Sequence, residues 1–235
     1  MASFGPQYCE TPAGYDELHP WSAFPAEPWN VWSSAVIVAY GLLAVLLVRR
    51  RAPAAWPLYL ACLFLIVNGA GSMLWHGLRT PWSLILDFLP AFFFVGLVAI
   101  LWARRVARPW QAVAILAILF GAQFLPRDLL AEIGFGQLGW IMVRALSVTV
   151  CAAWLIALTL PVSRGAAAAG TAALGLAILA LAMRSLDAEA CARFGFGSHF
   201  LWHIFLSTAA YLAMHVLVTL EPAAKIRPIL TTSNA

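Results

Sequence analysis

Charged residues are scarce in this sequence, and their scarcity excludes most soluble folds. Only 10% of the 235 residues are Asp, Glu, Lys or Arg, whereas 63% are hydrophobic and the mean hydropathy is +0.87. Soluble domains carry about 25% charged residues. The hydrophobic residues also come in blocks of about 20, the length that an α-helix needs to cross a bilayer. The composition therefore predicts an integral membrane protein.

Lysine is nearly absent, since a single lysine stands against thirteen arginines. This bias is typical of GC-rich bacterial genomes, so we expect a protein of the bacterial inner membrane. The net charge of +4 raises the question of nucleic-acid binding. The arginines flank apolar blocks, where basic residues set membrane topology. We therefore expect no nucleic-acid partner.

Basic residues are missing from the N-terminal segment, and the CxxC motif is missing from the whole chain. Residues 1–29 contain no Lys or Arg, so they lack the basic n-region of a cleavable signal peptide, and we expect the first apolar block to insert by itself. The four cysteines form no CxxC pair, which excludes a soluble zinc-finger pattern. Cys62 and Cys151 fall inside apolar blocks and are expected to pack as small apolar side chains.

The apolar blocks predict an all-α membrane protein, a bundle of seven transmembrane helices. The fourth block is short and the sixth is rich in alanine. We expect an extramembrane segment over residues 1–29, a seven-helix domain over 30–220 and a cytoplasmic tail over 221–235. The predicted spans are approximately residues 30–48, 56–75, 82–102, 110–125, 138–160, 166–183 and 199–220.

The basic residues predict the orientation of this bundle. Nine of them collect on one side and four on the other, and cytoplasmic loops are the ones enriched in Lys and Arg. We therefore expect the N-terminus outside and the C-terminus in the cytoplasm. The nine are Arg49, Arg50, Arg51, Arg104, Arg105, Arg108, Arg164, Lys225 and Arg227; the four are Arg79, Arg127, Arg184 and Arg193.

Five polar side chains converge near the outer face in this topology. The second span runs outward and ends with Ser72 and His76, whereas the third runs inward and carries Asp87 near its start. The last span also runs inward and opens with His199 and His203, which a spacing of four places on one helix face. Polar residues inside spans are costly and mark functional sites.

Three neutral imidazoles with one open position are the ligand set of a catalytic zinc site. We therefore expect His76, His199 and His203 to bind zinc. A carboxylate beside zinc-bound water can accept its proton and pass it to a leaving amine, the role expected for Asp87. A hydroxyl such as that of Ser72 can stabilise the oxyanion. This chemistry indicates hydrolysis of an amide or ester, and a site among membrane helices favours a lipid substrate.

Other interpretations of the same residues stay open. A b-type cytochrome would use His76 with His199 or His203 as axial haem ligands, although haem explains neither Asp87 nor Ser72. A receptor or binding protein would hold zinc without hydrolysing anything. A single polar residue in a span also often makes only a helix–helix hydrogen bond.

Spaced motifs in this chain resemble those of the alkaline ceramidases, part of the CREST superfamily of seven-helix hydrolases that also holds the adiponectin and progestin receptors. The stretch "GSMLWHGLRTPWSLILDFLP" carries Ser72, His76 and Asp87 in the family's spacing. The stretch "HFLWH" supplies His199 and His203 at the start of the last helix. The segments "YCE" and "AEPWNVWSS" are similar to two N-terminal motifs of the family.

This resemblance implies a zinc amidase that cleaves ceramide into sphingosine and a fatty acid, with the five residues in the roles given above. It also implies a disulfide between Cys9 and Cys191, both of which fall outside the spans, where an oxidising periplasm permits disulfides. The N-terminus-outside orientation of the family agrees with the charge count.

The resemblance further implies a calcium site in the N-terminal segment. Glu10 and Glu27 match its acidic ligands, and Asp16 and Glu17 could substitute for others, but Pro12 stands where the family has an Asn. Calcium takes six to eight oxygen ligands. A calcium site and a solvated acidic loop both remain open as interpretations.

The substrate is the second point at which this chain departs from the family. Many bacteria lack sphingolipids, so the expected substrate is ceramide or another N-acyl lipid. Arg144 lies about two turns into the fifth predicted span. It is expected either to snorkel toward the interface or to bind a head-group or a fatty carboxylate.

Overall fold

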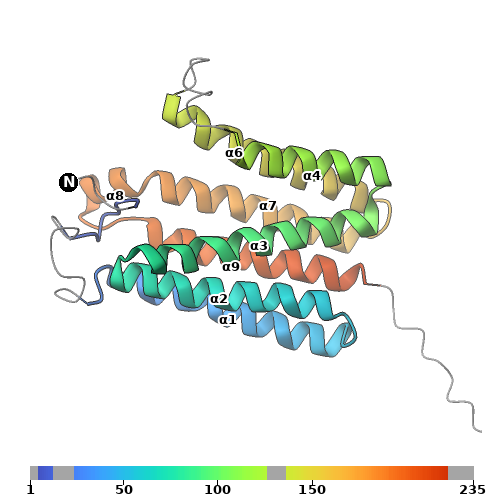
Figure 1. Ribbon diagram of the computed structural model, residues 1–235, viewed down its shortest axis with the longest axis horizontal. Helices are drawn as coiled ribbons and strands as arrows, with labels where there is room; N and C mark the ends of the chain where they lie inside the picture. Colours follow the sequence, from blue (N-terminus) through green and yellow to red (C-terminus); the bar gives the residue numbers. More distant parts are fainter. Residues whose placement is uncertain (1–4, 13–23, 126–135, 222–235) are drawn as a thin grey trace, which may run out of the picture.

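The computed structural model describes residues 5–12, 24–125 and 136–221, the side chains of 136–141 excepted, and within these ranges the chain is helical without strands (Figure 1). An all-α membrane protein, as expected, is confirmed by this architecture. The helices in chain order are α1 (Pro28–Arg51), α2 (Trp56–Leu78), α3 (Pro81–Val106), α4 (Pro109–Gln123), α6 (Gly136–Thr159), α7 (Arg164–Ser185), α8 (Asp187–Phe194) and α9 (His199–Thr219).

Six of the described helices are long and apolar enough to cross a membrane, namely α1, α2, α3, α6, α7 and α9. Helix α4 is equally apolar but has 15 residues. At a rise of 1.5 Å per residue such a helix is about 22 Å long, shorter than a hydrocarbon core of about 30 Å. The count of seven spans therefore stays a prediction that depends on α4.

Prolines begin four of these helices. Pro28, Pro57, Pro81 and Pro109 each occupy the first or second position of a helix. Proline suits that position because its fixed φ is helical and the N–H that it lacks has no partner there. The helices accordingly begin at or just before the predicted apolar blocks.

Helix α8 is an element that the hydropathy pattern does not predict. Its eight residues include Asp187, Glu189 and Arg193, so it is both too short and too polar to register as a span. It follows α7 after a single residue and lies at the end of the bundle where α9 begins (Figure 1).

The closest helix packing joins α1, α2, α3, α7 and α9, whereas α4 and α6 form a pair that lies against α3 and α7 (Figure 1). Glycines permit this close packing. A Cβ at Gly69 of α2 would stand 2.7 Å from the backbone nitrogen of Val38 in α1. Four of these five helices, α1, α2, α3 and α9, supply the histidines, serines and Asp87 discussed below.

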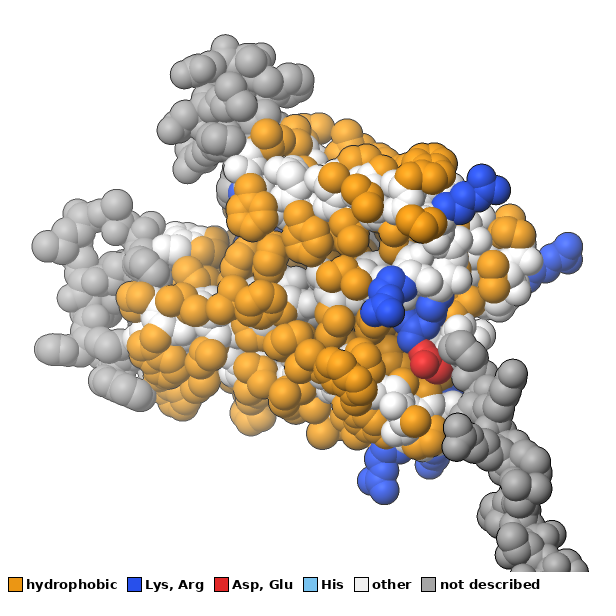
Figure 2. Space-filling view, turned by 45° about the vertical axis from the view of Figure 1, so that its right-hand side comes forward, with side chains coloured by type: hydrophobic (Ala, Val, Ile, Leu, Met, Phe, Trp, Pro, Cys, Tyr) orange, Lys and Arg blue, Asp and Glu red, His pale blue; other side chains and the backbone are white. Residues whose placement is uncertain are grey.

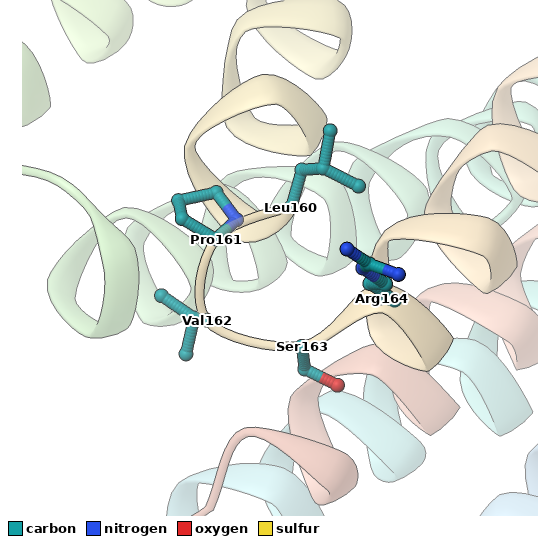
Figure 3. A pocket seen from close by; sticks show the side chains of 5 residues that line it. All are labelled: Leu160, Pro161, Val162, Ser163 and Arg164. Atoms are coloured by element: carbon teal, nitrogen blue, oxygen red, sulfur yellow. The ribbon is translucent and has the colours of Figure 1, made fainter.

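The two ends of the bundle differ in charge. Hydrophobic side chains cover most of the face seen in Figure 2, and arginines gather at the end where α1 and α3 finish and α7 begins. Arg105 forms an ion pair there with Glu221, which joins α3 to the end of α9. A hollow lined by residues 160–164 lies at the turn between α6 and α7 (Figure 3), at the opposite end of α7 from α8 and the start of α9.

Candidate metal centre

Three buried histidines meet where α2 ends and α9 begins. His76 lies in the last turn of α2, while His199 and His203 occupy the first two turns of α9. Their side chains are at most 3% exposed, and one ligand atom from each lies within 4.8 Å of the other two. The three residues predicted to converge are therefore brought together.

The geometry of the three rings fits a single small ion. Their centroids lie 4.8, 4.9 and 5.3 Å apart. Zn–N bonds of about 2.0–2.1 Å at tetrahedral angles place three imidazole centres about 5 Å apart. Axial haem ligands instead approach the iron from opposite faces of a macrocycle, and these rings, tilted or edge-on to one another, leave no space for one. The arrangement favours a metal ion over haem.

Two of the histidines are oriented by hydrogen bonds at Nδ1. His76 Nδ1 is paired with the Glu27 carboxylate. His203 Nδ1 lies 2.8 Å from Ser33 Oγ and 3.3 Å from Ser34 Oγ. Metal-binding histidines commonly use the second nitrogen in this way, which fixes the ring and leaves Nε2 for the ion.

His199 is held by stacking rather than by a side-chain hydrogen bond. Its ring stacks on Tyr8 with centroids 3.8 Å apart. Its Nδ1 is buried and has no hydrogen-bond partner among the described residues. A buried polar atom without a partner is unusual, and a bound cation is one way of satisfying it. Burial raises the pKa of Tyr8 to about 12, although Arg184 opposes this rise, so the phenol stays neutral.

Asp187 fixes the start of α9. One carboxylate oxygen accepts the backbone N–H of His199 and the other accepts that of Cys9, both at 2.8 Å. A Cβ at Gly197 would lie 2.1 Å from the Asp187 carboxylate, so only glycine fits this approach. The structure also joins Cys9 to Cys191 of α8 in a disulfide, with Cα atoms 5.5 Å apart. This is the pair that the resemblance implied.

Ser72 and Asp87 lie beside the histidines. The Ser72 hydroxyl is hydrogen-bonded to the Asp87 carboxylate and accepts a bond of 3.1 Å from Ser34 Oγ. Ser34 also lies near His203, so it connects the serine to the metal ligands. Asp87 is half-buried, whereas Ser72 is 1% exposed. Asp87 is therefore the more exposed of the two residues, and Ser34 holds the Ser72 hydroxyl in place.

A proline and a glycine set the position of Asp87. Pro90 has no N–H to donate to the carbonyl of Leu86 one turn earlier. That carbonyl faces Gly71, where an added Cβ would come within 2.1 Å of its oxygen. Asn68, which lies in α2 like Gly71, donates a hydrogen bond to the backbone carbonyl of Asp87 in α3. The break in the α3 ladder therefore lets α3 and α2 approach at the level of Ser72.

The N-terminal segment closes this end of the bundle through two carboxylates. Glu10 accepts the backbone N–H groups of Trp29 and Asn30, each at 2.9 Å, and so caps α1. Burial raises its pKa, which the two backbone hydrogen bonds counteract. Burial also raises the pKa of Glu27 above its ordinary value, and the adjacent Arg79 guanidinium offsets part of this rise.

Two of the four acids in the calcium site that the resemblance implied, Glu10 and Glu27, lie in the part of the chain that the structure describes, and their carboxylates are already bound by protein groups. Both oxygens of Glu10 are engaged by the α1 backbone, and those of Glu27 are engaged by four side chains. Asp16 and Glu17, the other two candidates, lie outside the described residues. Calcium needs six to eight oxygens, and these two acids offer none that is uncommitted.

Two arginines differ in their relation to the centre. Arg144 donates to the Gln123 carbonyl at the end of α4, which places it in the α4–α6 pair. Arg184 lies at the end of α7, beside two aromatic rings near the centre. Its guanidinium lies 5.8 Å from the Tyr8 ring centre and 5.2 Å from that of Trp202.

The comparison with known proteins agrees with this site. The family model described as Ceramidase matches residues 7–228. The chain belongs to the ceramidase family. A comparison with curated proteins finds no match for it. Membership of the family makes the chain a ceramidase-like hydrolase, with an amide as the bond acted on and a lipid as the substrate, and the apolar helices make it a multi-pass membrane protein.

Sequence reasoning missed several contributors to the centre of this ceramidase-family protein. Ser33, Ser34, Tyr8, Arg79 and Asp187 were assigned no role. A signal for Ser34 was present, because Glu27, Asn30 and Ser34 follow one another at spacings of three and four and so lie on one face of the helix that begins at Pro28. The others act through contacts with residues far away in the chain.

Proposed function

We propose that this protein is a zinc-dependent amidase that cleaves an N-acyl lipid into a free amine and a fatty acid. The observation that carries the proposal is the cluster of three buried histidines, with one ligand atom of each within 4.8 Å of the others, and the half-buried Asp87 beside it. A zinc ion held by His76, His199 and His203 would lower the pKa of a bound water molecule and polarise the amide carbonyl.

The protein's own residues would then transfer a proton from the water to the leaving nitrogen and stabilise the oxyanion. Asp87 accepts a proton as the water oxygen bonds to the carbonyl carbon, and it returns that proton to the nitrogen as the C–N bond breaks. Once Asp87 has taken up this proton it accepts hydrogen bonds less strongly, and the Ser72 hydroxyl, which Ser34 still donates to, turns its single proton from Asp87 to the carbonyl oxygen as negative charge grows there. Water and amide are consumed, and acid and amine are formed.

The substrate proposed is ceramide or another N-acyl lipid, approached from the bilayer. The positive charge of Arg184 next to Trp202 favours a lipid with an anionic group near its amide. Arg144, whose guanidinium is bonded to the α4 backbone, is the weaker candidate for that role. Arg184 forms no ion pair within the described ranges of the chain.

The topology proposed is a bundle of seven spans that includes α4, over residues 30–220, with the N-terminal segment outside and a cytoplasmic tail from 221. The Cys9–Cys191 disulfide at the end of the bundle that holds the centre supports placing that end in an oxidising compartment. The arginines at the other end support a cytoplasmic location for it. In a bacterial inner membrane the site would face the periplasm.

The deciding experiment is metal analysis of the purified protein, followed by mass spectrometry of its turnover of N-acyl lipids. We expect about one zinc per chain, its loss in His199→Ala, and release of fatty acid. Zinc retained by His199→Ala would refute the ligand set. Zinc without turnover of any N-acyl lipid would favour a receptor, and a Soret band would favour a cytochrome.

A further inference from the structure

We propose that Arg79 is the resident cation of the N-terminal cover, here defined as residues 5–12 and 24–27. Its guanidinium takes the place that a calcium ion would occupy beside Glu27. The cover then closes over the histidines without calcium, and Arg79 acts through Glu27 to position His76. The proposal goes beyond the hydrolase function and does not depend on it.

The guanidinium is buried at the point where the cover meets α2. Arg79 is 4% exposed and Glu27 is 0% exposed. Arg79 Nη1 lies 3.2 Å from Glu27 Oε1, and Nη2 donates to the Pro6 carbonyl at 2.7 Å. The group also lies 4.1 Å from the centre of the Trp75 ring. A single side chain thus holds both parts of the cover, residues 5–12 through Pro6 and residues 24–27 through Glu27.

Glu27 requires a positive charge because it is fully buried. A buried carboxylate without a counter-charge is strongly disfavoured. Neutral partners supply part of its hydrogen bonding, since the Thr11 hydroxyl donates to Oε1 and the Asn30 amide donates to Oε2 at 3.2 Å. His76 is bonded to Oε2. Among the described residues, Arg79 is the permanent cation paired with this carboxylate.

The carboxylate of Glu27 is already surrounded by protein groups. A carboxylate has about four lone-pair positions; three side chains are hydrogen-bonded to the two oxygens of Glu27, and the Arg79 guanidinium adds an ion pair. Calcium binds oxygens at about 2.3–2.6 Å. The Arg79 guanidinium instead lies 3.2 Å from Glu27 Oε1 and donates from its other terminal nitrogen to the Pro6 carbonyl, so one planar group serves both contacts.

The backbone at Arg79 shows that the side chain is retained against local preference. Arg79 ends α2 with φ of 52°, in the left-handed region. Glycine is the residue favoured at such helix ends, because a Cβ is disfavoured there. If Arg79 only ended the helix, glycine would serve at least as well. The arginine must therefore be explained by what its side chain contacts.

This conflict provides the test, because Arg79→Gly relieves the backbone while removing the charge. We expect Arg79→Gly to lower the melting temperature by about 10 °C and to weaken zinc binding at least tenfold, as loss of a group that orients a ligand does. Arg79→Lys, which keeps the charge without the fork, should lie between. Arg193→Gly, at an exposed arginine paired with Glu189, is the matched control.

Calcium is tested on the unaltered protein. We expect millimolar calcium and the calcium chelator EGTA to leave its melting temperature unchanged. The effect of Arg79→Gly should shrink in a Glu27→Gln background, since the two side chains act as a pair. A melting temperature that rises with calcium and falls with EGTA would overturn the proposal. So would an Arg79→Gly protein as stable and as zinc-binding as the parent. Neither outcome depends on lipid hydrolysis.

Discussion

At the scale of single residues, the proposed metal centre depends on side chains that are not among its three ligands. Ser33 holds the ring of His203 and Glu27 holds that of His76. Such partners set which nitrogen faces the metal and how freely the ring turns. Without them the rings of His76 and His203 would turn more freely. Ser33 lies in α1 and Glu27 lies just before it, so a segment without a histidine orients two of the three rings.

Ser33→Ala should weaken zinc binding by about tenfold to a hundredfold with little change in fold, because the lost bond orients His203. Competition with a chromogenic chelator measures the affinity. Ser207→Ala is the matched control, since Ser207 is equally buried on the helix of His203 but bonds only to the Ile204 carbonyl. Equal affinities for the two variants would remove the orienting role of Ser33.

Asp87→Asn should keep the zinc and lose about two to four orders of magnitude in turnover, because an amide cannot relay the proton. Zinc content and the rate of fatty-acid release are measured on the same sample. A variant that turns over as fast as the parent would show that Asp87 is not the acid–base group.

Arg184→Gln should raise KM at least tenfold for an N-acyl lipid with a phosphate or carboxylate near the amide, and change KM less than about threefold for a neutral ceramide. The reason is loss of the cation beside Trp202. Arg108→Gln, at an exposed arginine at the opposite end of the bundle, is the control. An equal effect on both lipids would indicate a purely structural role for Arg184.

At the scale of elements, the approach of α2 to α3 decides whether Ser72 and Asp87 meet. Gly71 allows the approach, and Pro90 frees the carbonyl that lies against it. Neither residue carries chemistry. Together they place a carboxylate from one helix beside a hydroxyl from another.

Gly71→Ala should separate the two helices, because its Cβ would lie 2.1 Å from the Leu86 oxygen. We expect a loss of about 1–3 kcal/mol in stability and a larger loss of hydrolysis than of zinc, since α3 supplies no metal ligand. Thermal unfolding and metal content test this. Gly175→Ala, where a Cβ meets nothing within 4 Å, should be neutral or mildly stabilising; equal effects at both glycines would refute the account.

The elements also show how far the sequence could predict this protein. The apolar blocks predicted the long helices, and the spacing of His199 and His203 predicted a shared face, because both features depend on local periodicity. Asp187 and Arg79 could not be found in this way. Their partners, Cys9 and Glu27, are distant in sequence, and a lone acid or arginine outside an apolar block looks like a solvated charge until the fold brings the pair together.

At the scale of the whole molecule, the N-terminal cover, α8 and the start of α9 form one connected cap over the histidines. The Cys9–Cys191 disulfide and the bond from the Cys9 N–H to Asp187 both join the cover to α8. Since Tyr8 stacks on His199, the cover also shields the centre from the water outside.

Cys9→Ser should therefore loosen the cap and expose the metal. We expect zinc loss to a chelator such as EDTA to become at least tenfold faster, with α-helix content unchanged because the helices keep their own packing. Stopped-flow chelation and circular dichroism measure the two. Cys62→Ser, at a free buried cysteine in α2, is the control, and identical chelation rates would show that the disulfide does not hold the cap closed.

The two hydrogen bonds of the Asp187 carboxylate have a consequence for biogenesis. They join Cys9, near the start of the chain, to His199, the first residue of the last helix. His76 is synthesised more than a hundred residues before His199, an interval on the order of ten seconds at the ribosome. The centre is therefore incomplete until the last helix has entered the membrane. A chain halted before that step would be inserted in the bilayer without the proposed ability to hydrolyse N-acyl lipids.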